Sequence, residues 1–475
     1  MFDRIAILNI VREGTGKTVE FIEKILQKNQ ELESEKEQLK KKVEKLESLL
    51  KKNSHNSSKP PSSDQKKQIK NSRASSSRNP GGQTGHKGTT LQLRDNPQKI
   101  IRHKVQKCKR CGNDIKQAEI IKIKRRQVID IPPIEVVVEE HQTEIKRCNC
   151  CGKINESKFP ERIKNTVQYG EQIKSITTYL WAKDQTPYQR ISETIQDIFN
   201  IKMSVGTINN IVREASDKAE LIREVIKTHI KDAPVLNADE TGLRVNKENY
   251  WQHVLSNEKL TYYAVHKNRG RTAIDEIGVL PEYKGICVHD GLTSYKSYEC
   301  RHALCNAHHL RELAYIAEEL KQKWAKKFID LLLDMKGEVE LSKSKNLSAI
   351  DGEKFTGYTI RYSTLIRSGY KETEKLKKEK KTAENLLYRL KKWKKEVMLF
   401  VADFRVPFDN NMAERDLRMM KLKQKISGCF RSVQGAMDFS AIRTILASAK
   451  KQKINRFDAI YNLFLNRPIL YFDAE

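Results

Sequence analysis

The sequence reads PVLNADETGLRV at residues 234–245, YWQHVLSN at 250–257, KLTYYAVHK at 259–267 and KGICVHDG at 284–291. All four segments are rich in the β-branched and aromatic residues that favour strands. A helical stretch follows Arg269-Gly270, between the third segment and the fourth. The order predicts a meander of three strands, then a helix and a fourth strand. We expect the fourth strand to lie beside the first.

Two of these strands carry an aspartate at matching places. Asp239 falls in the first strand, and Asp290 stands at the carboxyl end of the fourth. If those strands are neighbours, the two carboxylates lie side by side. This is the ribonuclease H-like arrangement, an α/β sheet whose adjacent carboxylates hold divalent metal ions. A third acid, Glu414, comes from PFDNNMAERDLRMMKLK (407–423), which predicts a helix that opens at Pro407.

Three carboxylates in one place suit phosphoryl transfer. Two Mg²⁺ or Mn²⁺ ions about 3.5–4 Å apart activate the attacking oxygen and stabilise the leaving one. We expect Asp239 to bridge both ions, with Asp290 and Glu414 completing one each. Helical spacing puts Asn411, Glu414, Arg418 and Lys421 on one face. The basic neighbours predicted to hold the DNA backbone near the metals are Arg415, Arg418 and Lys421.

The charge balance indicates a polyanionic partner. The chain of 475 residues has 90 Lys and Arg against 61 Asp and Glu, a net charge of +29. Such an excess repels itself in the compact state unless a polyanion such as nucleic acid neutralises it. No stretch approaches the roughly 20 apolar residues that cross a membrane, and no signal peptide is recognisable. We therefore expect a cytoplasmic protein whose nine cysteines are thiols or metal ligands rather than disulfides.

Two short cysteine motifs predict a zinc site. The sequence has CKRCG at 108–112 and CNCCG at 148–152. Four thiolates form a closed tetrahedral site with a structural role, and the predicted ligands are Cys108, Cys111, Cys148 and Cys151. Cys150 is a spare thiol that could take the place of Cys148, and buried free cysteines are the alternative without metal. A β-rich run broken at Pro132-Pro133 predicts a zinc ribbon with an enlarged hairpin.

Three further regions are candidates for DNA contact. The face around the cysteine motifs is basic and includes Lys107, Arg110, Arg125 and Arg126. Residues 166–232 predict short helices that resemble a helix-turn-helix, with an N-cap at Ser204. That motif would aim Thr207, Asn209, Asn210 and Arg213 at a major groove, although three packed helices without a ligand are an equal alternative. Arg431, in a loop before the last predicted helix (about 437–452), is a candidate phosphate contact.

The N-terminal region predicts a coiled coil. A heptad places Ile25, Leu32, Leu39 and Leu46 at one core position and Ile22, Asn29, Lys36, Val43 and Leu50 at the other. Polar residues at core positions select one register and oligomer, most often a parallel dimer, so we expect a homodimer. The alternative is a single amphipathic helix packed on its own domain. The Ser-, Pro- and Lys-rich segment that follows predicts a flexible basic tether.

The sequence thus predicts a multidomain α+β protein. Its expected parts are a coiled coil (1–52), a basic disordered linker (53–98), a four-cysteine zinc-binding module (99–165), a helix-turn-helix-like region (166–232), the first part of a ribonuclease H-like core (233–320), a helical insertion (321–400), and a core helix with the last acid and the C-terminal segment (401–475). Within the insertion, an inner stripe is expected from Leu376, Leu386, Leu387, Leu390 and Trp393. No catalytic role is assigned to the insertion.

Several motifs in order carry a family resemblance. They are Asn53-Ser54 through Pro60-Pro61-Ser62-Ser63-Asp64, GGQTGHKG (81–88), the paired cysteine motifs, ADET (238–241), HDG (289–291) with Tyr295, CNAH (305–308) and NNMAER (410–415). Together they cover nearly the whole chain, which resembles the transposases of the insertion-sequence-66 family. The separations of the acids, 51 residues and then 124, leave room for a large insertion before the last one.

This resemblance implies DDE chemistry on Asp239, Asp290 and Glu414. Water would first free a 3′-hydroxyl at each element end, and that hydroxyl would then attack target DNA without a covalent protein intermediate. The implied partners are the terminal inverted repeats of the element, target DNA and accessory proteins of the same element. The implied location is the nucleoid of a bacterial cell.

The sequence leaves two alternative functions and the role of one motif undecided. A nuclease on the same fold would cut DNA without joining it, and a zinc-containing dimeric regulator or a decayed element would do neither. The CNAHH motif at 305–309, with Cys300 and Cys287 nearby, is compatible with a second metal. A buried thiol beside a histidine that contacts DNA or a carboxylate is the favoured interpretation.

Overall fold

The computed structural model describes residues 11–12, 14–52, 56, 91–376 and 380–472. The chain divides into two units, one of residues 71–168 and 193–203 and the other of the remaining residues. Most of the predicted linker, 53–98, lies outside the described residues, as do the family motifs within it. No helix in the described ranges is long and apolar enough to cross a membrane.

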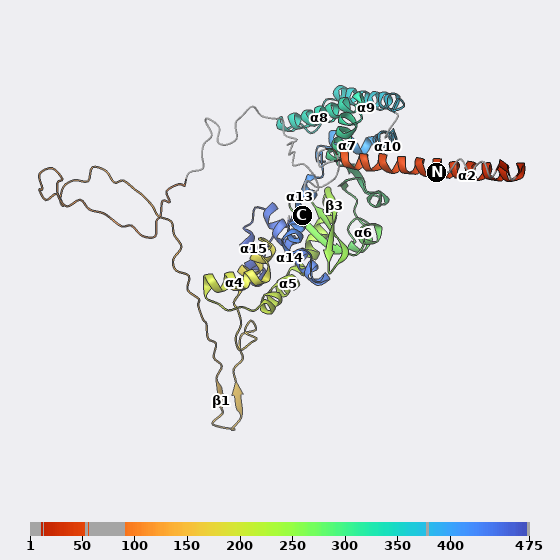
Figure 1. Ribbon diagram of the computed structural model, residues 1–475. Helices are drawn as coiled ribbons and strands as arrows, with labels where there is room; N and C mark the ends of the chain where they lie inside the picture. The colour runs from red at the N-terminus through yellow and green to blue at the C-terminus, as the bar shows by residue number, and fades with distance from the viewer. Residues whose placement is uncertain (1–10, 13, 53–55, 57–90, 377–379, 473–475) are drawn as a thin grey trace. The chain divides into compact units, whose positions relative to one another are not determined.

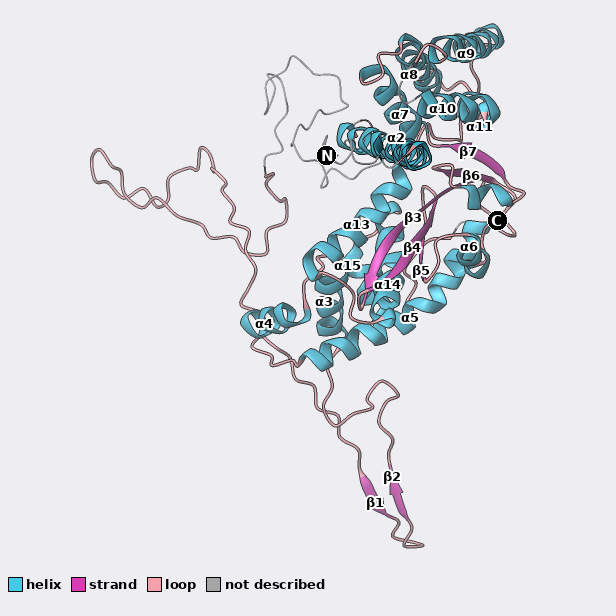
Figure 2. Ribbon diagram, turned by 45° about the vertical axis from the view of Figure 1, so that its right-hand side comes forward, coloured by secondary structure: helices cyan, strands magenta, loops and turns pink. Residues whose placement is uncertain are grey.

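The larger unit is built on a five-stranded mixed sheet (Figure 2). Its strands are β3 (Val235–Val245), β4 (Glu248–Ser256), β5 (Thr261–His266), β6 (Ile286–His289) and β7 (Arg301–Leu304), in the spatial order β5-β4-β3-β6-β7. The first three are antiparallel neighbours, and β6 and β7 run parallel to β3. The predicted meander and the pairing of the fourth strand with the first are therefore confirmed. The fifth strand, β7, was not predicted.

Helices from distant parts of the chain pack on this sheet (Figure 1). Helix α13 (Asn411–Ser427) packs on β3 and β4, and α14 (Val433–Lys451) packs on β5 and on α5 (Val205–Lys231). The backbone N–H groups of Thr261 and Tyr263 donate to the hydroxyls of Ser448 (3.0 Å) and Thr444 (3.2 Å) on α14. Because β5 is an edge strand, these hydroxyls satisfy donors that a neighbouring strand would otherwise take.

The remaining helices of the core are α3 (Glu171–Ala182), α4 (Tyr188–Phe199), α6 (Arg271–Ile277), α7 (Asn306–Glu318), α15 (Arg456–Phe464) and the 3₁₀ turn η2 (Thr293–Ser297). Three of them, α3, α4 and α6, agree with the breaks predicted at 185–187 and 203–204 and with the helix predicted after Arg269-Gly270. Ser204 caps α5 by accepting from the Thr207 N–H, as predicted. Helix α13 begins at Asn411 and not at Pro407, which corrects the predicted start. The Asp409 carboxylate accepts the Asn411 N–H at 3.0 Å and so fixes that start.

The predicted helical insertion is helical. It contains α8 (Lys323–Ser344), α9 (Gly352–Thr373), α10 (Lys380–Lys392), α11 (Lys394–Val397) and α12 (Leu399–Ala402). Trp324, Phe328 and Tyr362 are fully buried at its centre, together with three leucines of the predicted stripe: Leu386, Leu387 and Leu390. Leu376 and Trp393 are partly buried against the same cluster. The insertion therefore has a hydrophobic core of its own that continues into the sheet.

Two glycines of α9 give a matched test of how tightly this core is packed. A Cβ at Gly369 would lie 2.6 Å from Leu387 Cδ2 and 3.0 Å from Trp324, whereas a Cβ at Gly357 meets nothing within 4 Å. We expect Gly369→Ala to lower the free energy of unfolding by about 1–3 kcal/mol, because an overpacked core must shift. We expect Gly357→Ala to raise it by up to about 1 kcal/mol through helix propensity. Urea denaturation of both variants measures their free energies of unfolding. The same change in this free energy for both variants would contradict the packing argument.

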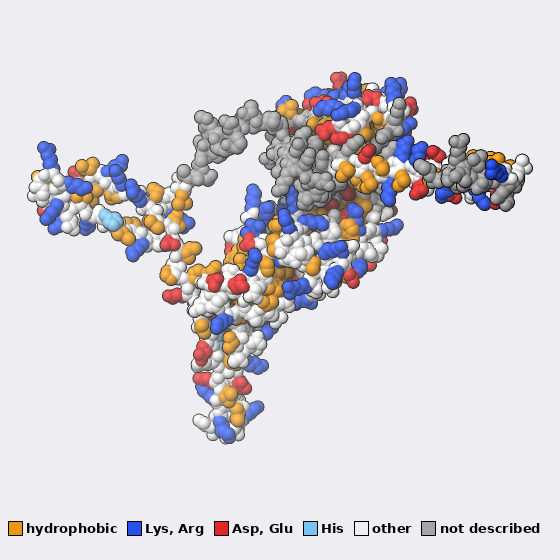
Figure 3. Space-filling view, viewed as in Figure 1, with side chains coloured by type: hydrophobic (Ala, Val, Ile, Leu, Met, Phe, Trp, Pro, Cys, Tyr) orange, Lys and Arg blue, Asp and Glu red, His pale blue; other side chains and the backbone are white. Residues whose placement is uncertain are grey.

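The smaller unit differs from its prediction in one respect. Strands β1 (Ile145–Arg147) and β2 (Ile154–Glu156) pair antiparallel around the second cysteine motif. Residues 115–144, where an enlarged hairpin was predicted, contain no strand. Two prolines interrupt the ladder of donors there, and apolar side chains such as Ile121 and Val128 remain almost fully exposed with no surface to pack on. Within this segment, Lys and Arg occur only between Lys116 and Arg126, and residues 127–144 contain neither. Figure 3 shows Lys and Arg side chains scattered over the visible face of the described residues.

The N-terminal residues form one long helix, α2 (Thr15–Lys51). Its heptad residues are exposed in the single chain, among them Ile22, Leu32, Leu39, Val43 and Leu46. Pairing of this helix with a second copy stays a prediction.

Candidate active site

The register of the sheet aligns the first two predicted acids. Asn237 of β3 is the partner of Val288 in the parallel strand β6. Asp239 and Asp290 each lie two residues further along, so they occupy equivalent positions on neighbouring strands. Since side chains alternate along a strand, Asp239 and the adjacent Glu240 belong to opposite faces of the sheet.

Asp239 lies in an environment that disfavours its negative charge. Burial raises the pKa of its carboxyl to about 8, and the charges of Glu240, Asp290 and Glu414 add to this rise. The N–H of Glu240 donates to Asp239 at 2.9 Å and acts in the opposite direction. The three predicted acids are therefore close enough to repel one another. A bound divalent cation would remove that repulsion.

Glu414 belongs to the first turn of α13 and faces two residues of α7. Its Oε2 lies 3.7 Å from an Arg311 guanidinium nitrogen, and its Oε1 lies 3.9 Å from His308 Nδ1. Glu414 Oε1 and His308 Nδ1 are both shielded from solvent and have no hydrogen-bond partner. A buried carboxylate oxygen without a donor is a costly arrangement, and a metal ion is a natural partner for it.

Asn410 connects β3, the start of α7 and the start of α13. Its Nδ2 donates to the Ala238 carbonyl at 2.8 Å, and its Oδ1 accepts from Asn237 Nδ2 at 2.8 Å. Its backbone N–H donates to Cys305 Sγ at 3.1 Å, at the start of α7. Its carbonyl accepts the N–H of Glu414 at 3.2 Å. One buried side chain thus fixes the start of α13 against β3, beside Asp239.

On the opposite face of β3, Glu240 forms a second set of buried polar contacts. Glu240 is buried, and its carboxylate accepts from Tyr295 at 2.6 Å and from Arg269 Nε at 2.8 Å. Tyr295 lies in η2, directly after Asp290, and its ring is 5.0 Å from that of His289. Burial raises the pKa of Glu240, whereas its bonds to Tyr295 and Arg269 lower it. These contacts tie the segment after Asp290 to the strand that carries Asp239.

The donor set fits a hard divalent cation. Carboxylate oxygens are the ligands of Mg²⁺ and Mn²⁺, and the pKa of Asp239 and the unpartnered oxygen of Glu414 both favour a positive ligand. The ligand oxygens of Asp239, Asp290 and Glu414 do not all lie within 4.8 Å of one another. Among the described residues, the one group of three metal-binding side chains whose ligand atoms all lie within 4.8 Å is Cys305, His308 and Glu414.

The four basic residues predicted to contact phosphate from the C-terminal part of the chain differ in whether their side chains are free to reach DNA. Arg415, Arg418 and Arg431 are exposed, as DNA contact requires. Lys421 instead donates to the Gly242 carbonyl of β3 at 2.7 Å, so its ammonium group also holds α13 on the sheet. Burial lowers the pKa of Lys421.

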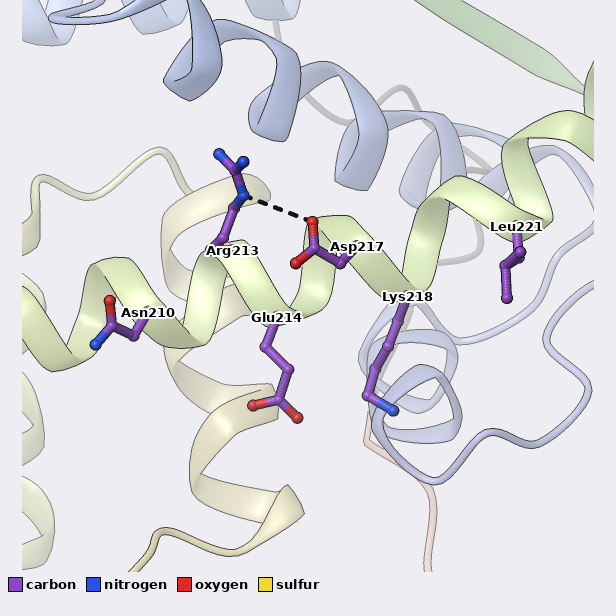
Figure 4. Close-up of a pocket in the computed structure, with 6 residues that line it drawn as sticks. All are labelled: Asn210, Arg213, Glu214, Asp217, Lys218 and Leu221. Atoms are coloured by element: carbon purple, nitrogen blue, oxygen red, sulfur yellow. Dashed lines mark ion pairs between the residues drawn. The ribbon is translucent and has the colours of Figure 1, made fainter. Parts of the chain in front are cut away.

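The predicted reading face of α5 has mixed charge. Asn210 and Arg213 line a shallow hollow of about 530 Å³ together with Glu214, Asp217, Lys218 and Leu221 (Figure 4). Arg213 lies 3.5 Å from Asp217 and 3.7 Å from Asp438, so acidic groups already engage its charge. Thr207 is half-buried, and its hydroxyl lies 2.9 Å from that of Ser204 in the cap. Base reading by this helix therefore stays a prediction.

The two cysteine motifs have the same local backbone. Gly112 donates to the Cys108 carbonyl at 3.0 Å, and Gly152 donates to the Cys148 carbonyl at 2.9 Å. Both glycines have a positive φ, +74° and +72°, which closes each turn. Backbone N–H groups lower the pKa of Cys108 and of Cys148. Each motif is thus a knuckle suited to a metal thiolate, although the described structure does not bring three of these sulfurs within 4.8 Å.

Around the knuckles, the predicted basic residues are exposed: Lys107, Arg110, Arg125 and Arg126. In the second knuckle, Cys148 and Cys151 occupy the positions of Cys108 and Cys111, and Cys150 is exposed between them. The CNAHH motif at 305–309 places a buried thiol and His308 beside a carboxylate, as the favoured interpretation expected. His309 is buried and bonded to Asn306.

Four residues of the site were not assigned a role from the sequence: Asn410, Glu240, Arg269 and Arg311. Asn410 and Glu240 do belong to motifs that carry the family resemblance, and this was the signal available for them. Arg269 and Arg311 gave no signal, because their partners are distant in sequence.

Comparisons with known families agree with this geometry. Residues 166–438, more than half of the chain, match a family described as Transposase IS66 family. Residues 106–152 match the zinc-finger binding domain of transposase IS66, and residues 15–92 match a family of unknown function (DUF6444). No curated protein matches the sequence significantly. The zinc-finger match supports a structural zinc at the knuckles, and the transposase match covers all three acids. The chain belongs to the IS66 family of transposases.

Proposed function

We propose that this transposase cuts the strands at the ends of its element and joins them to target DNA by a DDE mechanism. The core would be ribonuclease H-like, and the acids would be Asp239, Asp290 and Glu414. The observation that carries the proposal is the parallel register of β3 and β6, which aligns two of the acids, with the third on a helix packed on β3.

Each acid has a distinct place in this proposal. Asp239, whose carboxyl has a raised pKa, would bridge two Mg²⁺ or Mn²⁺ ions, and Asp290 and Glu414 would each complete one. The ions would supply Lewis acidity to the attacking and leaving oxygens. Arg311 would hold the second oxygen of Glu414 so that the first stays directed at the site. Arg415 and Arg418 would hold the DNA backbone through phosphate contacts.

The reaction would have two displacement steps at phosphorus. In the first, a water oxygen bonds to phosphorus at the element end, the bond from phosphorus to the 3′-oxygen breaks, and that oxygen takes a proton. In the second, the freed 3′-hydroxyl bonds to a target phosphorus and a target 3′-oxygen leaves. The first step is a hydrolysis that leaves a 5′-phosphate monoester and a 3′-hydroxyl. The second exchanges one phosphodiester for another, and the proton lost by the attacking hydroxyl is balanced by the one that the leaving oxygen takes, so neither step needs an oxidant or an external energy source.

The remaining parts would bring DNA and protein copies together. We expect α2 to pair with a second copy, and the basic knuckle region, α5 and Arg431 to contact the terminal inverted repeats or target DNA. Accessory proteins of the same element are expected partners, and the bacterial nucleoid is the expected location. The exposed heptad residues of α2 and the net charge of +29 support these assignments.

We expect Cys108, Cys111, Cys148 and Cys151 to hold one structural zinc ion. Cys148→Ser should lose that zinc and make residues 106–152 more sensitive to protease, because four thiolates close the site and fix its fold. Cys150→Ser, the matched control, should keep it, since Cys150 lies between the two knuckle positions. Metal analysis and limited proteolysis of both variants check this. If Cys150→Ser loses zinc and Cys148→Ser keeps it, Cys150 is the ligand in place of Cys148.

The test of the function is a cleavage-and-joining assay on labelled DNA that carries the gene's flanking repeats. With Mg²⁺ or Mn²⁺, we expect nicks at the repeat ends and joined products, both absent with scrambled ends and with Asp290→Asn. Cutting without end preference or joining would establish the rival nuclease. DNA binding with no chemistry at any metal concentration, with and without the element's accessory proteins, would leave the regulator or decayed element.

A further inference from the structure

Three potential ligands of different chemistry converge next to the proposed catalytic acids. Cys305 Sγ, a ring nitrogen of His308 and a carboxylate oxygen of Glu414 all lie within 4.8 Å of one another. The sulfur comes from the residue before α7, the imidazole from the first turn of that helix, and the carboxylate from the first turn of α13. Three side chains from two helices therefore face a common point.

Two of these atoms have no other partner. His308 Nδ1 and Glu414 Oε1 are shielded from solvent, lie 3.9 Å apart and accept or donate no hydrogen bond. A direct hydrogen bond would need a distance of about 3 Å. The structure thus leaves a buried imidazole nitrogen and a buried carboxylate oxygen facing each other with room for an atom between them.

The third atom is held in place by the backbone. The N–H of Asn410 donates to Cys305 Sγ at 3.1 Å, and the backbone of His308 also donates to it. Burial raises the pKa of the Cys305 thiol, and these two N–H groups act in the opposite direction. What the bonds supply is the fixed position of the sulfur. The same Asn410 fixes the start of α13, so the contacts that place Glu414 also hold the sulfur near it.

We propose that Cys305, His308 and Glu414 form a second metal site, selective for Zn²⁺ and other thiophilic divalent ions, which competes with the catalytic metal for Glu414. A thiolate, an imidazole and a carboxylate are the three ligand types that Zn²⁺ binds, with one position left for water. Mg²⁺ does not use sulfur. Binding releases the thiol proton of Cys305 to solvent, and the two negative ligands balance the ion beside Arg311.

The consequence is an inhibitory effect of zinc. This part of the proposal depends on the proposed function, because Glu414 must be a ligand of the catalytic metal for the two sites to compete. Zn²⁺ at Cys305 and His308 would turn Glu414 Oε1 away from the ion beside Asp290. Excess Mg²⁺ would restore activity only in part, since Mg²⁺ cannot displace a thiolate-bound ion.

The first experiment counts zinc and needs neither DNA nor activity. The full chain is titrated with Zn²⁺ alone, and its retained metal is measured. We expect wild type to hold one more zinc per chain than Cys305→Ser and His308→Gln. Cys429→Ser, a half-buried cysteine away from the site, is the matched control and should keep the wild-type count. Co²⁺ should give a thiolate charge-transfer band that Cys305→Ser reduces and Cys429→Ser does not.

The second experiment measures zinc inhibition of cleavage at fixed Mg²⁺. We expect Cys305→Ser to need at least about tenfold more Zn²⁺ for half-inhibition than wild type or Cys429→Ser. Equal zinc counts in wild type, Cys305→Ser and His308→Gln would overturn the site. Different counts with equal inhibition would overturn the competition. If no variant cleaves DNA at any metal concentration, the proposed function fails while the zinc count still decides the site.

Discussion

Replacement of Asp239 by asparagine is expected to abolish cleavage and joining while DNA binding persists. The change removes a metal-binding carboxyl group that lies in register with Asp290, and whose pKa is raised by burial and by the charges of its acidic neighbours. We expect the cleavage rate to fall by at least about 10³-fold, because metal-ion stabilisation of a phosphoryl transition state is worth several kcal/mol. Single-turnover cleavage of end DNA in Mg²⁺ measures the loss.

The matched control is Asp232→Asn. Asp232 is exposed at the end of α5, just before β3, and undergoes the same chemical change. We expect it to cleave at the wild-type rate. DNA affinity should be unchanged in Asp239→Asn, because the raised pKa of Asp239 leaves its carboxyl mostly uncharged near neutral pH in the protein without metal. An Asp239→Asn protein that cleaves within tenfold of wild type would exclude this residue as a metal ligand.

Asn410→Ala is expected to have the second largest effect. Alanine keeps the backbone bonds to Cys305 Sγ and Glu414 but leaves the Asn237 amide and the Ala238 carbonyl without partners at a buried position. We expect a loss of about 2–4 kcal/mol in the free energy of unfolding. A displaced Glu414 should lower the cleavage rate by about 10²-fold, measured well below the melting temperature.

The metal dependence separates positioning from simple destabilisation. If Asn410 positions Glu414, the variant should also require more Mg²⁺ for half-maximal rate, which a loss of stability alone would not change. Asn411→Ala is the matched control, because the Asn411 bond to Asp409 uses the backbone N–H and survives the substitution. An unchanged Mg²⁺ requirement in Asn410→Ala would limit its role to folding.

Several features of this site could be derived from local sequence. The strand order near Asp239 and Asp290 followed from β-branched segments and their spacing, and the cap at Ser204 followed from a short helix signal. The cysteine knuckles followed from a spacing that contains its own turn residue, Gly112 or Gly152. Each strand, the cap and each knuckle form from residues that are neighbours in the chain, whereas the pairing of β3 with β6 joins residues about 50 positions apart.

Other features depended on surroundings that local sequence does not contain. The β-rich run at residues 125–144 has strand propensity, yet it forms no strand because no partner strand or apolar surface is present there. Helix α13 begins at Asn411 because Asp409 supplies its first acceptor there, which the nearby proline did not reveal. Lys421, predicted as a DNA contact, donates to a carbonyl of β3 that is 179 residues away.

The sequence by itself predicted four of the five strands of the sheet, the two cysteine knuckles and the family, because these depend on residue type and spacing over short stretches. The catalytic role of the three acids stays a prediction. Only the tertiary structure decided what surrounds the acids. Asn410 meets Ala238 across 172 residues, and His308 meets Glu414 through two packed helix ends. Such contacts depend on how the helices pack on the sheet, and packing is a property of the whole chain rather than of any one segment.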